Sequence, residues 1–143
     1  MINSIDCIQD KSEMKVLVGA LPPVFTASFQ NGSTRLYNHP EVVLGDVKQE
    51  QEGLRFANPG KSFVEVHFNV EQKLNHPFLL TINPEAGEPV TVTINGENVS
   101  GSEVTSLIQE GKNVVRIALD ADADASFTLS SISLSRKFNG IVR

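Results

Sequence analysis

The sequence contains a single cysteine, Cys7, among 143 residues. One thiol excludes an internal disulfide framework and any metal site that is built from several cysteines. Because Cys7 lies near the N-terminus, we expect it to be a bystander and not a catalytic nucleophile.

Positive charge is also scarce. Lys and Arg number 12 against 17 Asp and Glu, which gives a formal net charge of −5. The densest basic pair is Arg136-Lys137, so the chain lacks the basic stripe with which proteins bind a phosphate backbone. The composition therefore argues against a nucleic-acid partner.

Long apolar runs are missing from the sequence. No stretch reaches the roughly 18 consecutive apolar residues of a transmembrane helix. Residues 1–14 also lack the basic segment and apolar stretch of a secretory signal peptide. We expect no membrane partner. We expect a cytoplasmic protein if the chain is full length, and an extracellular one if a leader has been removed.

The length suits a single domain, because two domains of about 70 residues each would have thin cores. Residues 1–13 show no clear period, and we expect an N-terminal arm or edge segment there. Residues 14–143 are expected to form one domain.

Strand-like patterns dominate from Met14 onward. We expect strands at 14–20, 24–29, 42–44, 54–57, 63–70, 78–83, 90–94, 113–119 and 126–135. Residues 34–52 are the least regular part, and a short helix is expected only within 102–109. Roughly eight to nine short strands, with turn signals about every 8 to 12 residues, predict an all-β antiparallel sandwich or barrel.

The clearest alternation spans residues 63–70 and predicts two different faces. The core face holds Val64, Val66, Phe68 and Val70. The opposite face, which could meet solvent or a ligand, holds Phe63, Glu65, His67 and Asn69.

A longer pattern runs through residues 90–135. A strand ends in Asn95-Gly96, a short helical turn follows at 104–107, and Gly111-Lys112-Asn113 leads into the next strand. This succession resembles the galactose-binding-like jelly roll. That superfamily includes many carbohydrate-binding modules and the sugar-binding domains of β-galactosidases and β-glucuronidases. The resemblance covers about a third of the chain, reports fold more than activity, and implies a jelly-roll β-sandwich.

The same pattern suggests which side chains complete the core. We expect Leu107 to close one end of the sandwich. Val114, Ile117 and Leu119 are expected to supply core from the strand over 113–119.

A first candidate site surrounds the only tyrosine. Sugar-binding members of the superfamily stack a sugar ring on an exposed Trp or Tyr, and this chain offers only Tyr37, or an exposed Phe such as Phe63. The resemblance puts the loop of Tyr37 at the ligand rim, where Asn38 and His39 offer hydrogen bonds. The alternative is a Tyr37 that packs its ring and exposes only its hydroxyl.

A second candidate site is the polar face of 63–70. Glu65 and His67, together with Arg55 on the preceding strand, form a mixed group that could bind several hydroxyls. The alternative is a solvated sheet face with an Arg–Glu cross-strand pair.

A third candidate is the acidic run of Asp120, Asp122 and Asp124. Alternating carboxylates suggest Ca²⁺, but Ala125 and Ser131 stand where an EF-hand requires Gly and Glu. We therefore expect an acidic hairpin tip and no metal.

Catalytic motifs are missing from the sequence, so we expect no catalytic residue, no cofactor and no enzyme. A carboxylate pair for glycoside cleavage stays open, because such a partnership is spatial. The sequence predicts a non-catalytic binding module whose ligand, by resemblance, is carbohydrate. The alternative is a ligand-free structural or assembly protein that acts as a homo-oligomer, which the apolar segment 14–20 and the N-terminal arm suggest.

Overall fold

A computed structural model describes residues 23–73, 77–87 and 89–136. The expected arm over 1–13, the strand over 14–20 and Cys7 lie outside the described residues. The described residues form twelve strands: β1 Pro23–Ser28, β2 Arg35–Tyr37, β3 Glu41–Leu44, β4 Val47–Gln49, β5 Leu54–Phe56, β6 Phe63–Val70, β7 Phe78–Asn83, β8 Val90–Ile94, β9 Glu97–Asn98, β10 Gly111–Leu119, β11 Phe127–Leu129 and β12 Ser131–Arg136.

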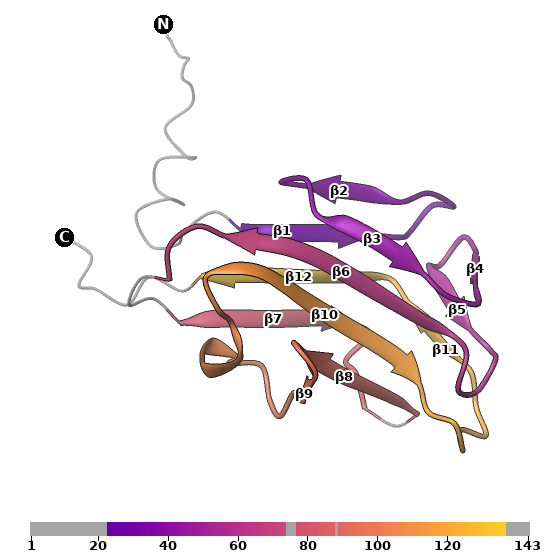
Figure 1. Cartoon of the computed structure of the whole chain (residues 1–143). Coiled ribbons are helices and arrows are strands. Elements are labelled where there is room, and N and C mark those ends of the chain that lie inside the picture. Colours follow the sequence, from indigo (N-terminus) through magenta and orange to yellow (C-terminus); the bar gives the residue numbers. More distant parts are fainter. Residues whose placement is uncertain (1–22, 74–76, 88, 137–143) are drawn as a thin grey trace, which may run out of the picture.

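The strands make two layers with the core between them (Figure 1). The first sheet has the order β2-β1-β12-β7, and the second sheet has the order β3-β6-β10-β8-β9. A third, smaller sheet has the order β11-β5-β4. Every described strand pair is antiparallel. The all-β, antiparallel fold class is therefore confirmed.

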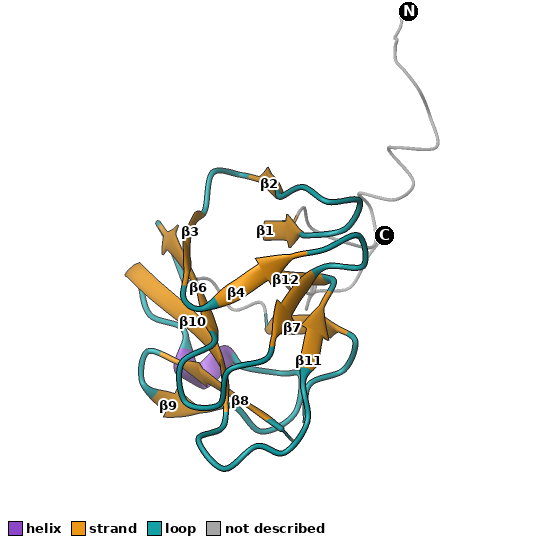
Figure 2. Ribbon diagram, turned by 90° about the vertical axis from the view of Figure 1, so that its right-hand side faces the viewer, coloured by secondary structure: helices purple, strands orange, loops and turns teal. Residues whose placement is uncertain are grey.

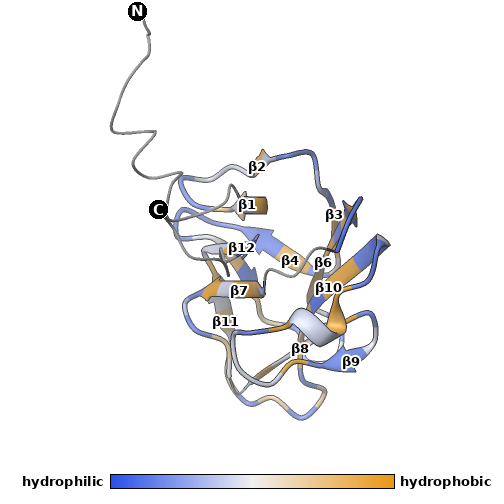
Figure 3. Cartoon of the chain, turned by 90° about the vertical axis from the view of Figure 1, so that its left-hand side faces the viewer, coloured by the Kyte–Doolittle hydropathy of each residue, from blue (hydrophilic) through white to orange (hydrophobic). Residues whose placement is uncertain are grey.

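Alternating side chains build the core, as the sequence predicts. The even-numbered residues of β6 are buried, and so are Val115, Ile117 and Leu119 of β10. The rings of Phe25 in β1 and Phe68 in β6 meet with their centroids 4.9 Å apart, which joins the two layers directly. Figure 2 shows the two layers from the side, and Figure 3 shows apolar colour gathered in the strands while β9 and many of the connecting loops are hydrophilic.

One predicted core residue is wrong. Val114 is only partly buried, because it lies opposite His67 on the outer face of the second sheet. In a strand the side chains alternate, so Val114 cannot share a face with Ile117. Val115 takes the core position.

Three further segments differ from the expectation. In the irregular region 34–52, the strand expected over 42–44 forms as β3, but β2 and β4 are strands that the sequence did not predict, because three residues are too few to show a period. The single strand expected over 126–135 is two strands, β11 and β12, which belong to different sheets.

The expected helix is a three-residue 3-10 turn, η1 Thr105–Leu107. Val104 and Ile108, on either side of it, are buried, and Leu107 packs against the core while staying partly exposed. In the ranges that the structure describes, no helix is long and apolar enough to span a membrane.

The Asn-Gly turn of the sequence pattern forms between β8 and β9. Asn95 and Gly96 both have positive φ, 53° and 86°, as a type I′ hairpin turn requires. The buried Asn113 ties this turn to the start of β10, because its Oδ1 accepts a hydrogen bond from Nδ2 of Asn95. The segment that carries the resemblance is thus held together by polar side chains as well as by its core.

Candidate functional site

The outer face of the second sheet gathers charged side chains from β6 and β10. The two strands are antiparallel, with Glu65 opposite Arg116 and His67 opposite Val114. Residues that are directly opposite in an antiparallel pair point to the same side of the sheet. Both Glu65 and His67 therefore stand beside Arg116, away from the core.

Glu65 is the centre of this cluster. Its Oε2 accepts a hydrogen bond from Nη1 of Arg116 at 2.6 Å, and its Oε1 lies 3.0 Å from Nε2 of His67. The side chains of Glu65, His67 and Arg116 are 24 %, 37 % and 41 % exposed. We call these three residues the Glu65 triad. All three are reachable from solvent.

The triad keeps Glu65 ionised. The hydrogen bond with His67 is the largest cause that lowers the pKa of the Glu65 carboxyl, and the hydrogen bond from Arg116 is the second. Partial burial opposes them weakly. Glu65 is therefore an acceptor at neutral pH, which suits hydrogen bonding better than proton donation.

The ring of Phe63 packs against Arg116 of the triad. The Cζ atom of Arg116 lies 4.2 Å from the centroid of the Phe63 ring, which is a cation–π contact. The same ring covers Gly45, where an added Cβ would lie 2.2 Å from Cδ1 of Phe63. The close approach requires glycine at position 45 and fixes the ring that carries the Arg116 guanidinium.

The triad offers donors and acceptors side by side. Arg116 has five N–H donors, of which Glu65 engages one by the bond above, and each carboxylate oxygen of Glu65 has a second lone pair. A His67 ring that donates from Nε2 keeps Nδ1 as an acceptor in its neutral form. Such a face can bind groups that are donor and acceptor at once, as hydroxyls are.

Arg116 is the residue that the sequence did not single out. It stands at an outward position of β10, between the buried Val115 and Ile117. The only sequence signal for Arg116 was its place between two apolar residues of a strand. Its pairing with Glu65 could not be read from the sequence, because the two residues are 51 positions apart.

The expectation that Arg55 joins Glu65 and His67 on one face is wrong. Arg55 lies in β5 of the third sheet, opposite Thr128 and Lys48, while Glu65 lies in the second sheet and pairs with Arg116. Arg55 lines a separate shallow depression of about 380 Å³ with Asp46 and Lys48.

Tyr37 does not join the Glu65 triad. It lies opposite Thr26 in the first sheet, and the neighbouring positions of β1, Phe25 and Ala27, face the core. Tyr37 therefore points away from the core on the opposite outer face of the molecule, with half of its surface exposed. The two candidate sites of the sequence are on different sides.

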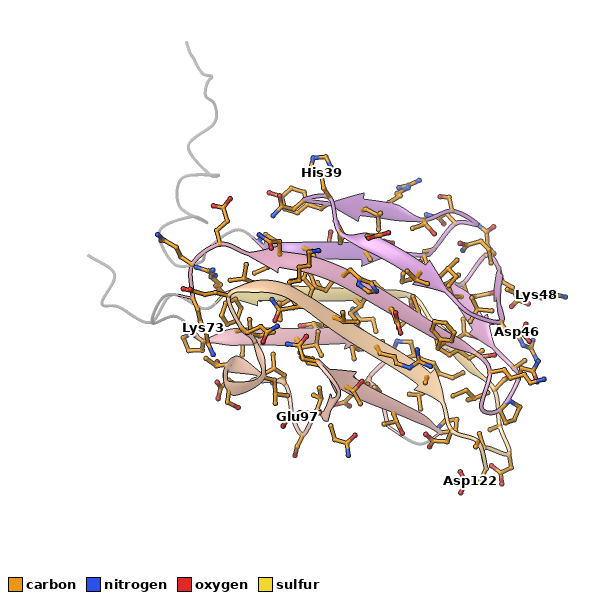
Figure 4. The ribbon with its side chains drawn as sticks, viewed as in Figure 1. His39, Asp46, Lys48, Lys73, Glu97 and Asp122 are labelled. Carbon is orange, nitrogen blue, oxygen red and sulfur yellow. The ribbon has the colours of Figure 1, made fainter. Side chains whose placement is uncertain are left out.

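Asn38 and His39 form the link between β2 and β3. Nδ2 of Asn38 donates to the carbonyl of Val24 at 2.8 Å, which ties this link to β1. His39 has a positive φ of 57° and projects outward from the upper edge in Figure 4. The structure thus gives Asn38 a structural contact and leaves His39 exposed.

A larger cavity of about 830 Å³ opens between β7 and β8. Its apolar part includes Ile82, Val92 and Val99, and its polar part includes Asn83 and Asn98. None of the site residues expected from the sequence lines this cavity, because neither strand carries a charged or aromatic motif there.

The acidic run forms a turn at the far end of the sandwich from His39 (Figure 4). The amide of Ala123 donates to the carbonyl of Asp120, and Oδ1 of Asp120 accepts from the Thr91 hydroxyl. Within the described residues, no group of three or more His, Cys, Asp or Glu could hold a metal ion.

Comparisons with protein families, with characterised proteins and with solved structures find no match to this chain.

Proposed function

We propose that this protein is a non-catalytic carbohydrate-binding module and that the Glu65 triad binds the sugar. The observation that carries the proposal is the shared hydrogen bonding of one partly exposed carboxylate, that of Glu65, by Arg116 and His67. A guanidinium next to a carboxylate matches two neighbouring hydroxyls, since one can accept from Arg116 while the other donates to Glu65.

The ionised state of Glu65 favours binding over catalysis. A general acid for glycoside cleavage needs a raised pKa, whereas the hydrogen bonds of His67 and Arg116 lower the pKa of Glu65. In this proposal Glu65 accepts hydrogen bonds from the ligand and transfers no proton.

Strand topology supports the finer proposal that the fold is a galactose-binding-like jelly roll. The first described strand, β1, lies beside the last, β12, and β6 lies beside β10. Such pairing of early with late strands, in two facing sheets, is what a jelly roll requires.

The lack of a free aromatic ring beside the triad limits the expected affinity for a sugar. Phe63 has Arg116 over its ring, and Tyr37 is on the other outer face. A sugar at the triad is therefore bound mainly by hydrogen bonds, for which water competes. We expect dissociation constants of about 0.1 to 1 mM, equivalent to binding free energies of roughly 4 to 5.5 kcal/mol.

A glycan array followed by calorimetry on the full chain tests the proposal. Arg116→Ala and Glu65→Gln should each weaken binding at least about tenfold, because each removes a charged hydrogen bond of about 1.5 to 3 kcal/mol. Arg55→Ala is the matched control, since Arg55 lies in the third sheet. No binding to any glycan at millimolar concentration would exclude the proposal.

A second candidate function is self-assembly, and one observation favours it. Four large apolar residues of the described chain are conspicuously exposed: Leu36 and Tyr37 in β2, and Val43 and Leu44 in β3. Both strands are sheet edges, and unpaired edges invite pairing with another chain. Light scattering tests this candidate, because a strict monomer at high concentration removes it.

A further inference from the structure

Among the described residues, the seam between β2 and β3 leaves side chains on the core side partly exposed. Leu36 lies opposite the buried Ala27, and Leu44 lies opposite the buried Val64. Opposite residues share a face, so both leucines stand on the core side of their sheets. They are nevertheless 45 % and 46 % exposed.

The opposite side of the sandwich, at the edge strand β7, is partly covered by the chain. There the chain after β9 crosses the edge of β7, where the Leu80 amide donates to the carbonyl of Ser102 at 2.8 Å. Val104 and Ile108 of the same crossing are buried. Part of that side is thus closed by the chain itself, whereas Leu36 and Leu44 meet solvent.

The free edges of β2 and β3 lie on the same side of the sandwich. β2 ends the first sheet and β3 ends the second, and Figures 2 and 3 place the two strands at the same end of the layers. Neither strand contains Lys or Pro, which are common protections of a sheet edge.

We propose that a second copy of this chain docks here, edge to edge, about a two-fold axis perpendicular to both sheets. This inference rests on the self-assembly candidate and is independent of sugar binding. Such an axis pairs β2 with β2 and β3 with β3, antiparallel in both layers at once. Leu36 and Leu44 of the two copies then close one continuous core.

The side chains of β2 complement each other under this symmetry. When Leu36 lies opposite Leu36 of the second copy, Arg35 comes opposite Tyr37 of the second copy, and the reverse. Arg35 and Tyr37 share the outer face of the first sheet, so each pair can form a cation–π contact. The edge thus carries its own matching charge and aromatic groups.

A single cysteine at the axis tests the arrangement. The Leu36→Cys variant, in a Cys7→Ser background, should oxidise to a covalent dimer, because directly opposed residues have Cα atoms about 4.5 to 5.5 Å apart, within disulfide range. Thr81→Cys is the matched control, since Thr81 is exposed on the edge strand β7. It should stay monomeric.

Sedimentation of the reduced full chain completes the test. We expect a dimer that Leu36→Glu and Leu44→Glu weaken at least about tenfold and that Thr81→Glu does not change. A monomer at all concentrations, as when the chain's own segment 14–20 covers the seam, overturns both this inference and the self-assembly candidate. A dimer that Leu36→Glu leaves intact overturns the inference alone.

Discussion

The side-chain amide of Asn95 donates a hydrogen bond of 2.9 Å to the side-chain carbonyl of the buried Asn113. Asn113 also bonds both backbone groups of Gln109 and the carbonyl of Gly111, while Oδ1 of Asn95 accepts from the Val114 amide. Two asparagines thus satisfy the backbone of a turn and a return loop that lie 18 residues apart.

Asn113→Ala should lower the free energy of unfolding by about 3 kcal/mol. The substitution removes the partners of several partly buried backbone groups, and each unsatisfied group costs about 1 to 3 kcal/mol. Urea denaturation measures the change. Asn98→Ala, at an exposed position of β9, should stay within about 0.5 kcal/mol of the wild type. An equal effect of the two substitutions would contradict the role of Asn113.

The chain contains an internal comparison for asparagine deamidation. Asn31-Gly32 and Asn95-Gly96 are both exposed and have similar positive φ at Asn. Deamidation requires the glycine nitrogen to attack the side-chain carbon, which then releases ammonia. The Asn95 side chain makes three hydrogen bonds, whereas that of Asn31 makes none within the described residues.

We therefore expect Asn31 to deamidate faster than Asn95. Breaking one or two hydrogen bonds of about 1 kcal/mol each corresponds to a factor of roughly 5 to 30. Peptide mapping by mass spectrometry after incubation at pH 8 gives both rates. In Asn113→Ala the rate at Asn95 should rise toward that at Asn31. Equal rates in the wild type would show that the hydrogen bonds do not protect Asn95.

Gly45→Ala should destabilise the fold and weaken ligand binding together. The added methyl would meet the Phe63 ring at 2.2 Å, and such overpacking costs about 1 to 3 kcal/mol. The displaced ring would no longer support Arg116. Gly87→Ala is the control, because its Cβ would meet nothing within 4 Å. Thermal unfolding and calorimetry would show the two effects, and an unchanged Gly45→Ala protein would refute the close approach.

The stability of the fold should depend on Glu65 at acid pH. The pKa of Glu65 is lowered in the folded chain, so its contribution is fully present above its unfolded pKa of roughly 4.3. That contribution disappears as the pH falls through the lower, folded pKa. Glu65→Gln should therefore reduce the loss of stability on acidification below about pH 4.5. Identical pH profiles of the two proteins would contradict the triad.

Local periodicity predicted the individual faces of the strands but not which strands meet. The alternation in β6 correctly separates Val64 and Val66 from Glu65 and His67. The partner of Glu65 comes instead from β10, 51 residues away, and sequence proximity wrongly suggested Arg55. Likewise, β2 and β4 have only three residues each, too few to reveal a period, so their pairing shows only in the fold.

Calorimetry of the full chain with the tightest binder from a glycan array tests sugar binding at the Glu65 triad most directly. We predict binding to the wild type and to Arg55→Ala with the same affinity, and an affinity at least about tenfold lower for Arg116→Ala. Equal affinities for Arg116→Ala and the wild type would contradict the account, because the sugar would then bind elsewhere on the molecule.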